Sequence, residues 1–314
     1  MADPGSGGLM GSHTFAQRRR RIRERDTALA MLFVVPTAGY VLAFILGPVV
    51  LAVAYALSDV TVADPSFDWV GLANIDVVLA DSVFWRSLLN TFVITAGTTS
   101  LAVAGGNVLA RLMLARVYGR WLVRLCVLLP WVTPVTISAV SWLWLLNSVY
   151  SPLDWAGRQL GLLGAAESAN WLGRPSTAVA AVVAVQAWRL TPLAAVIIMA
   201  GLVAIPRNIH EAARIDGAGR WMRARFMTVP LTAPIVAVAA LFCAVFTFGD
   251  MAVVRILTDG GPNRSTEMLA TLAFGKAIDG GDVGQGAAVA LFLLPVLLAA
   301  TLAIVGLVRR MVAR

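Results

Sequence analysis

Residues 211–234 read EAARIDGAGRWMRARFMTVPLTAP, and this stretch is the key to the fold because it lies between two long apolar runs. Two acids stand in it, and five arginines fall between residues 207 and 225. The chain of 314 residues is 59% hydrophobic and only 13% charged, with a mean hydropathy of +0.80. That composition is typical of a polytopic membrane protein, so the chain is expected to be divided into membrane spans and not into soluble domains.

Six apolar segments are long enough to cross a membrane as helices, which takes about 20 residues each. They are residues 28–57, 88–113, 121–147, 177–203, 231–257 and 286–308. The basic residues before the first segment resemble a signal peptide, but its apolar run is too long for one and predicts an uncleaved helix. In the second segment, small residues predict close helix packing: Gly97, Gly105 and Gly106. We therefore predict an all-α polytopic membrane protein with six transmembrane helices.

The arginines indicate how the spans are oriented. With the N-terminus inside, 18 of the 25 basic residues fall in cytoplasmic segments, at 18–25, 111–124, 207–225 and 309–314. Cytoplasmic loops carry such an excess, so both termini are predicted to be cytoplasmic. The formal net charge of +8 then reflects this bias and attraction to membrane lipid, and no nucleic-acid partner is predicted. The domain organisation is a disordered basic tail at 1–27, a transmembrane domain at 28–308 and a tail at 309–314.

The cytoplasmic connection at 205–232 is predicted to contain a short helix parallel to the membrane. Pro206 and Asn208 form a helix start, and Glu211 in the first turn complements the helix dipole. Gly217 breaks the helix, and arginines then hold the following segment at the lipid headgroups: Arg220, Arg223 and Arg225. By spacing alone this is an arginine-anchored amphipathic connector, which is common in membrane proteins.

The same connection resembles a loop shared by one family of transport proteins. The pattern is E-A-A, three residues, Gly, nine residues, a hydrophobic residue, one residue, a hydrophobic residue and Pro, here Glu211, Ala212, Ala213, Gly217, Met227, Val229 and Pro230. This is the EAA loop of the inner-membrane permease subunits of bacterial ABC importers. ILTDGGP at 256–262 and WVGLANI at 69–75 are similar to turns of the permeases that handle maltose-like sugars and glycerol phosphate. The resemblance covers about residues 28 to 310.

The resemblance implies a type I ABC importer permease fold in the bacterial plasma membrane. The chain would form half of the translocation path for a sugar or sugar-like solute, as one half of a heterodimer with a second permease of similar fold. Two ATP-binding subunits and an extracytoplasmic solute-binding protein would complete the importer. The loop would dock as a coupling helix in a groove of the ATPase, through Glu211, Ala212, Ala213, Asp216, Gly217 and Ala218.

The chain has no sequence for binding ATP itself. A phosphate-binding loop needs GxxxxGK followed by Ser or Thr, and the only lysine, Lys276, is followed by Ala277. ATP and Mg²⁺ are therefore expected on the partner ATPase, and this subunit is expected to be non-catalytic and without a cofactor. Cys126 and Cys243 fall in separate spans, where they indicate packing and neither a disulfide nor a metal site.

Polar residues inside the spans mark the expected substrate path, because they are costly in lipid and usually face the bundle interior. Asp250 is the leading candidate, and Thr247 and Phe246 precede it by three and four residues, on the same face of a helix. Gln186 and Arg189 in the fourth span complete the set. Arg189 has two open roles, since it either contacts substrate or pairs structurally with Asp250.

Two other classes of protein remain as alternatives. An ion-coupled secondary transporter would show internal repeats and discontinuous helices, and no convincing repeat is found in the sequence. A membrane-embedded enzyme would need clustered acids, histidines or serines at one depth. The only histidines are His13 in the tail and His210 in the loop, which does not favour an enzyme.

Overall fold

A computed structural model describes residues 31–115, 118–149, 151–161, 163–164 and 168–312, and the predicted tail at 1–27 lies outside this range. The chain divides into two compact units, one up to Ala54 and one from Tyr55 onward. The helix Met31–Ala56, whose residues up to Ala54 belong to the first unit, is the first candidate membrane span and includes the π-helical turn η1 (Leu42–Leu46) and α2 (Gly47–Ala56). Residues 31–46 are all exposed, as expected for apolar side chains that face lipid.

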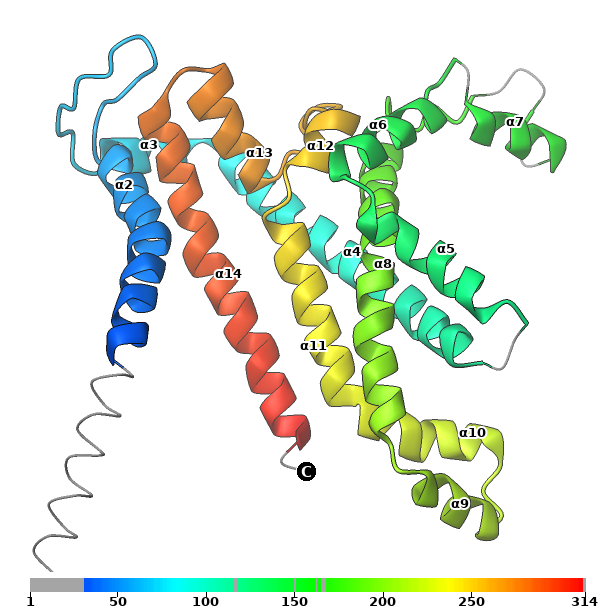
Figure 1. The fold of residues 1–314 in the computed structure, drawn as a ribbon. Helices are drawn as coiled ribbons and strands as arrows, with labels where there is room; N and C mark the ends of the chain where they lie inside the picture. Colours follow the sequence, from blue (N-terminus) through cyan, green and yellow to red (C-terminus); the bar gives the residue numbers. More distant parts are fainter. Residues whose placement is uncertain (1–30, 116–117, 150, 162, 165–167, 313–314) are drawn as a thin grey trace, which may run out of the picture. The chain divides into compact units, whose positions relative to one another are not determined.

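The second unit is built on four long helices: α4 (Ser82–Leu114), α8 (Pro175–Ala204), α11 (Val229–Phe248) and α14 (Val283–Val312). The first three pack against one another, and α14 packs on α11 (Figure 1). Among the residues that the structure describes, β contacts are limited to two isolated bridges. The helical architecture follows from the apolar sequence, because a helix satisfies its own backbone hydrogen bonds in lipid.

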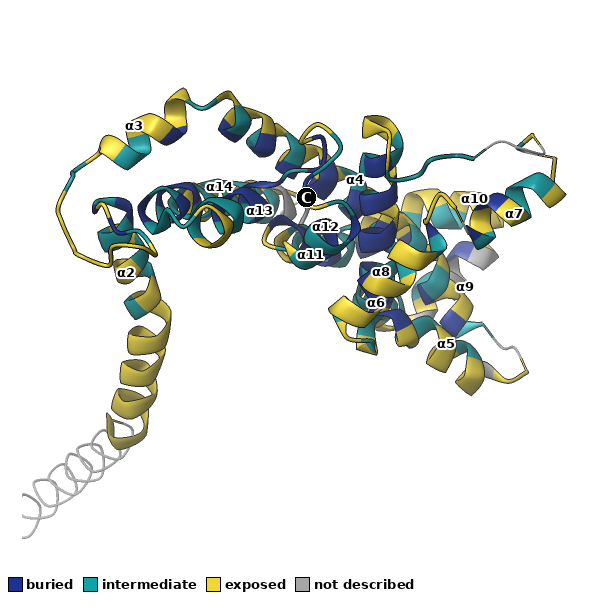
Figure 2. Ribbon diagram, turned by 90° about the horizontal axis from the view of Figure 1, so that it is seen from above, coloured by how far each residue is buried: buried dark blue, intermediate teal, exposed yellow. Residues whose placement is uncertain are grey.

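The packing of α4 on α8 depends on the small residues of α4. A Cβ atom on Gly106 would lie 2.7 Å from the Cβ atom of Ala194 and 2.9 Å from the backbone nitrogen of Ala195. A Cβ atom on Gly97 would lie 3.2 Å from a methyl group of Val183. The predicted close approach of helices is thus confirmed, and α8 is the most buried of the long helices; dark blue marks buried residues in Figure 2.

The predicted third span is not one straight helix. It consists of α5 (Arg120–Val132) and α6 (Val135–Leu145), which meet at an angle of 97°. Pro134 lacks a backbone N–H and forces the residue before it out of the helical region, so Thr133 is extended with φ −68° and ψ 133°. Among the residues that the structure describes, five helices are long and apolar enough to cross a membrane alone, and the bent pair makes six when it is taken as one span, which agrees with the six predicted spans. The prediction of a continuous helix at 121–147 is therefore wrong.

The predicted fifth span also ends earlier than expected. Helix α11 stops at Phe248, and the separate short helix α12 (Ala252–Leu257) follows. Gly249 caps α11. The Oδ1 atom of Asp250 then accepts a hydrogen bond of 3.0 Å from the backbone N–H of Val253, in the first turn of α12. The prediction of one helix to residue 257 is wrong for this local reason.

The connections lie at opposite ends of the second unit, as Figure 1 shows for α9 and α10 at one end and α12 and α13 at the other. The first end has α9 (Arg207–Ile215), α10 (Arg220–Arg223) and the π-helical turn η2 (Ala224–Thr228), which runs directly into α11. The other end has α3 (Ala73–Ala80), α7 (Pro152–Gln159), α12, α13 (Leu269–Phe274) and the π-helical turn η3 (Gly275–Asp279). Short helices thus form connections at both ends of the unit.

Candidate functional site

The loop between α8 and α11 contains the predicted short helix, α9, followed by a glycine turn. Gly217 has a φ of +76°, a conformation that residues with a side chain rarely adopt. The turn is closed by a hydrogen bond of 2.9 Å from the backbone nitrogen of Ala218 to the carbonyl of Ala213. The prediction that Gly217 ends the helix is confirmed.

Exposure divides the loop residues into two groups. Glu211, Asp216 and Gly217 are exposed, and Ile215 beside them is 86% exposed. Ala213 is only 1% exposed, so its methyl group packs inside this chain and is not available to a partner, and Ala218 is half-buried. Ala212 lies in α9, but its side chain is outside the described residues. The open surface is therefore charged, with one large aliphatic residue.

A polar cluster lies where α8 meets the break between α11 and α12. Arg189 forms an ion pair of 2.5 Å with the Oδ2 atom of Asp250 and donates a hydrogen bond of 3.0 Å to the Oε1 atom of Gln186. The two side chains of the ion pair are only 15% and 9% exposed, and Gln186 is fully buried. The structural pairing of Arg189 with Asp250, one of its two predicted roles, is present in this structure.

The predicted helical face of Phe246, Thr247 and Asp250 does not form, because Asp250 lies beyond the end of α11. The Thr247 hydroxyl is buried and donates to the carbonyl of Cys243 at 2.8 Å. Phe246 remains 45% exposed, and its ring packs edge-on against Trp131 of α5 with centroids 5.5 Å apart. The contribution of Trp131 was not predicted from the sequence. It lies in an apolar segment, where only the neighbouring Pro130 distinguishes it from the other apolar residues.

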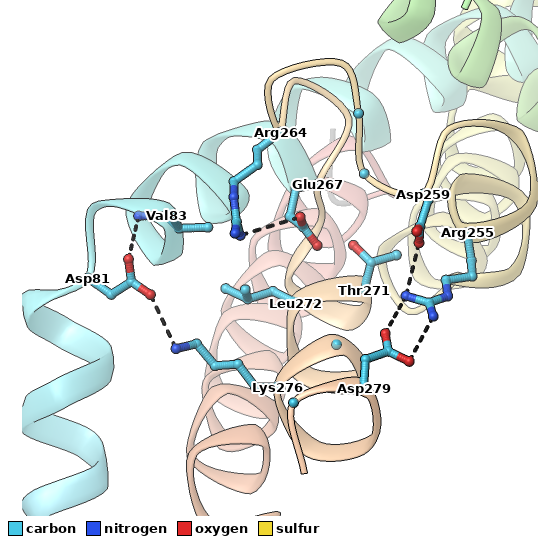
Figure 3. A pocket seen from close by; sticks show the side chains of 14 residues that line it. Asp81, Val83, Arg255, Asp259, Arg264, Glu267, Thr271, Leu272, Lys276 and Asp279 are labelled. Atoms are coloured by element: carbon cyan, nitrogen blue, oxygen red, sulfur yellow. Dashed lines mark hydrogen bonds and ion pairs between the residues drawn. The ribbon is translucent and has the colours of Figure 1, made fainter. Parts of the chain in front are cut away.

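A charged cleft of about 660 Å³ opens at the end of the unit that contains α12 and α13 (Figure 3). Arg255 on its wall pairs with Asp279 at 2.6 Å and with Asp259 at 2.9 Å. Lys276 pairs with Asp81 at 3.2 Å, which connects η3 to the corner between α3 and α4. This cleft was not predicted from the sequence, although the glycine turns at 260–261 and 280–281 lie on both sides of α13.

Glu267 is the most buried of the four carboxylates that line the cleft. Its carboxylate lies 3.8 Å from the guanidinium of Arg264, and its side chain is only 14% exposed. Burial raises the pKa of Glu267 above its ordinary range, because a buried carboxylate is more costly charged than neutral. The cleft therefore combines three paired basic residues with one carboxylate of raised proton affinity.

Comparisons with known proteins agree on one family. The family described as "Binding-protein-dependent transport system inner membrane component" matches residues 102–313. A trehalose/maltose transport system permease protein of Thermococcus litoralis is 33% identical over 282 residues, which cover 90% of this chain and 94% of that protein. A sulfoquinovosyl glycerol transport system permease protein of Agrobacterium fabrum is 30% identical over 84% of this chain and 85% of its own length.

Solved structures share the fold. A bacterial ABC transporter involved in the import of the polysaccharide alginate matches with a TM-score of 0.77 at 19% identity, covering 93% of this chain and 99% of that one. A likeness at this identity supports the type I importer permease architecture. The sequence matches, over most of both chains, identify the family: this protein belongs to the binding-protein-dependent transport system inner membrane components, the non-catalytic permease subunits of ABC importers.

Proposed function

We propose that this subunit forms half of the translocation path for a sugar or sugar-like solute and is driven by a separate ATPase through the loop at 205–232. The observation that carries the proposal is the exposed helix α9 with its glycine turn, at one end of a bundle that belongs to a permease family. Family membership favours ATP-driven import over ion-coupled secondary transport. The importer would also contain a second permease, two ATP-binding subunits that hold ATP and Mg²⁺, and an extracytoplasmic solute-binding protein.

The coupling surface is proposed to be the exposed part of the loop: Glu211, Ile215, Asp216 and Gly217. The buried methyl group of Ala213 supports this surface from within, and Ala212 and Ala218 complete the predicted set. A short helix that is seated in a groove of a partner moves with that partner when the partner's domains close. Because α9 connects through α10 and η2 to α11, closure of the ATPase dimer would move the long helices.

The substrate path is proposed to run along α11 and α8, bordered by Gln186, Arg189, Phe246, Thr247 and Asp250. The exposed ring of Phe246 and the half-buried ring of Trp131 together form an aromatic surface. An aromatic surface beside a few fixed polar groups suits the apolar ring face and hydroxyl rim of a sugar. The relatives named for trehalose, maltose and sulfoquinovosyl glycerol support this class of solute.

ATP hydrolysis by the reconstituted importer tests the proposal. The chain would be purified with its partner subunits, placed in proteoliposomes with the binding protein, and supplied with a panel of sugars and glycerol phosphates. We expect one solute class to stimulate hydrolysis and to accumulate inside. Uptake that follows an ion gradient without ATP would contradict the proposal.

The substrate-path assignment has its own test within the same assay. Phe246→Ala should raise the solute concentration needed for half-maximal stimulation, because it removes the exposed ring. Phe92→Ala is the matched control, since Phe92 is similarly exposed at 44% on α4 but packs against Phe248. Equal effects of the two substitutions would refute a specific role for Phe246.

A further inference from the structure

The segment from Arg220 to Thr228, formed by α10 and η2, presents basic and aromatic side chains on its exposed face. Arg220 and Arg225 are exposed, and so are Trp221 at 80%, Met222 at 54% and Phe226 at 71%. The opposite side is packed into the chain, with Thr228 buried. A helical segment with arginines beside bulky apolar residues is typical of an element that lies in the membrane interface.

Among the described residues, the ion pairs do not include the arginines of this segment. No Asp or Glu occurs between Gly217 and Gly249. Within the part of the chain that the structure describes, the ion pairs are made by other residues, on α8 and around the charged cleft. Arg111, at the end of α4, differs because its Nε atom donates to Asn107 at 2.8 Å. The charge of the segment is thus available to an external anion.

Arg223 adds an independent observation. Its Nε atom is buried and has no hydrogen-bond acceptor among the residues that the structure describes. An N–H group buried without a partner costs about 1–3 kcal/mol, so such a group usually binds something that supplies an acceptor. The η2 turn directly follows Arg223, and π-helical turns of this kind occur frequently at functional sites.

We propose that α10 and η2 form a binding site for the headgroup of an anionic phospholipid. The guanidinium groups of Arg220, Arg223 and Arg225 would bind the phosphate, and Trp221 and Phe226 would enter the acyl boundary beside it. A guanidinium provides paired donors that match phosphate oxygens. The exposed aromatic residues favour a lipid over a free phosphate ion, which has no apolar part for them to bind.

Native mass spectrometry of the purified importer, titrated with dioctanoyl phosphatidylglycerol or dioctanoyl phosphatidylcholine, tests the site. The variant Arg220→Gln/Arg225→Gln keeps the half-buried Arg223 and removes two exposed charges. Its Kd for phosphatidylglycerol should rise about thirty-fold, which corresponds to about 1 kcal/mol for each arginine. The matched control is Arg309→Gln/Arg310→Gln, which removes two exposed charges from the end of α14.

The outcomes separate a lipid site from a free-phosphate site and from a protein contact. The lipid site is supported if the control variant binds phosphatidylglycerol normally, phosphatidylcholine binding is unchanged in both variants, and millimolar inorganic phosphate does not displace the lipid. It is overturned if both variants lose affinity equally, if neither does, or if inorganic phosphate competes. It is also overturned if phosphatidylglycerol binding survives while the ATP-binding subunits are lost, because the segment would then be a protein contact.

Discussion

Replacing Asp250 by Asn tests what the polar cluster between α8 and the α11–α12 break does. The substitution keeps an oxygen that can accept the hydrogen bond from the backbone of Val253, but it removes the charge that faces Arg189. Arg189 would retain only its 3.0 Å hydrogen bond to Gln186 in a site where its side chain is 15% exposed. Removing one partner of a buried ion pair costs about 3–5 kcal/mol, because the other charge stays buried without compensation.

The free energy of unfolding in mixed micelles would be measured for Asp250→Asn, Arg189→Gln and the double variant. Each single substitution should lower it by about 3–5 kcal/mol. The double variant should recover to within about 1–2 kcal/mol of the native protein, because two neutral amides replace the pair and leave no buried charge. Arg255→Gln is a suitable control, since its ion pairs are partly exposed and contribute less.

Solute-stimulated ATP hydrolysis by the same variants distinguishes the two roles of Arg189. If the ion pair acts structurally, the double variant regains hydrolysis together with stability. If Arg189 contacts the solute, the double variant regains stability but not the response to solute. A single Asp250→Asn variant that is as stable as the native protein would show that burial imposes no such penalty on the unpaired arginine.

Two further predictions concern the packing of the bundle and the charged cleft. Gly106→Ala should lower the free energy of unfolding by about 1–3 kcal/mol, because the new Cβ atom meets the backbone nitrogen of Ala195 at 2.9 Å. Gly306→Ala on α14 is the control and should not lower it, because its new Cβ atom has no neighbour within 4 Å. Since the pKa of Glu267 is raised, the folded state holds its proton more tightly, so stability should fall as pH rises from near 4.5 through the raised pKa. A Glu267→Gln variant should lack this fall, and an unchanged pH profile would contradict the burial of that carboxylate.

The approximate positions of the long helices could be predicted from the sequence because membrane insertion depends on summed apolarity. The apolar segment at 177–203 has nearly the same bounds as α8, and the segment at 88–113 lies inside α4. The break at Gly217 was equally predictable, since a glycine between a short amphipathic helix and an arginine-rich segment is a local signal. These features depend on composition or on a few adjacent residues.

The two breaks in the predicted spans could not be predicted from hydropathy. Hydropathy is summed over a window of residues and does not show where the chain bends within that window. Pro130, Pro192, Pro234 and Pro295 all lie inside helices, whereas Pro134 lies at the 97° bend. At the bend, the carbonyl of Leu129 accepts from the backbone N–H of Thr133 at 3.1 Å and from its hydroxyl at 2.7 Å, so the last turn of α5 is closed before the chain changes direction. The sequence does not show which proline lies at such a bend.

The candidate site also contains some features that could be predicted from the sequence and others that could not. The pairing of Arg189 with Asp250 was one of two predicted roles, because opposite charges in neighbouring spans attract. The charged cleft was not predicted, since Asp81 and Lys276 are far apart in sequence and meet only through tertiary packing. The exposed surface of the loop also could not be predicted from the sequence, because only the structure shows that Ala213 is buried and Ile215 is exposed.

Coupling through the α9 turn can be measured as the ratio of solute imported to ATP hydrolysed in proteoliposomes. Gly217→Val places a branched side chain at a φ of +76°, whereas Gly219→Val places it at −65°, and neither new Cβ atom has a neighbour within 4 Å. We expect Gly217→Val to insert normally but to import less solute per ATP, while Gly219→Val keeps the native ratio. A native ratio in both variants would contradict the assignment of this loop as the coupling element.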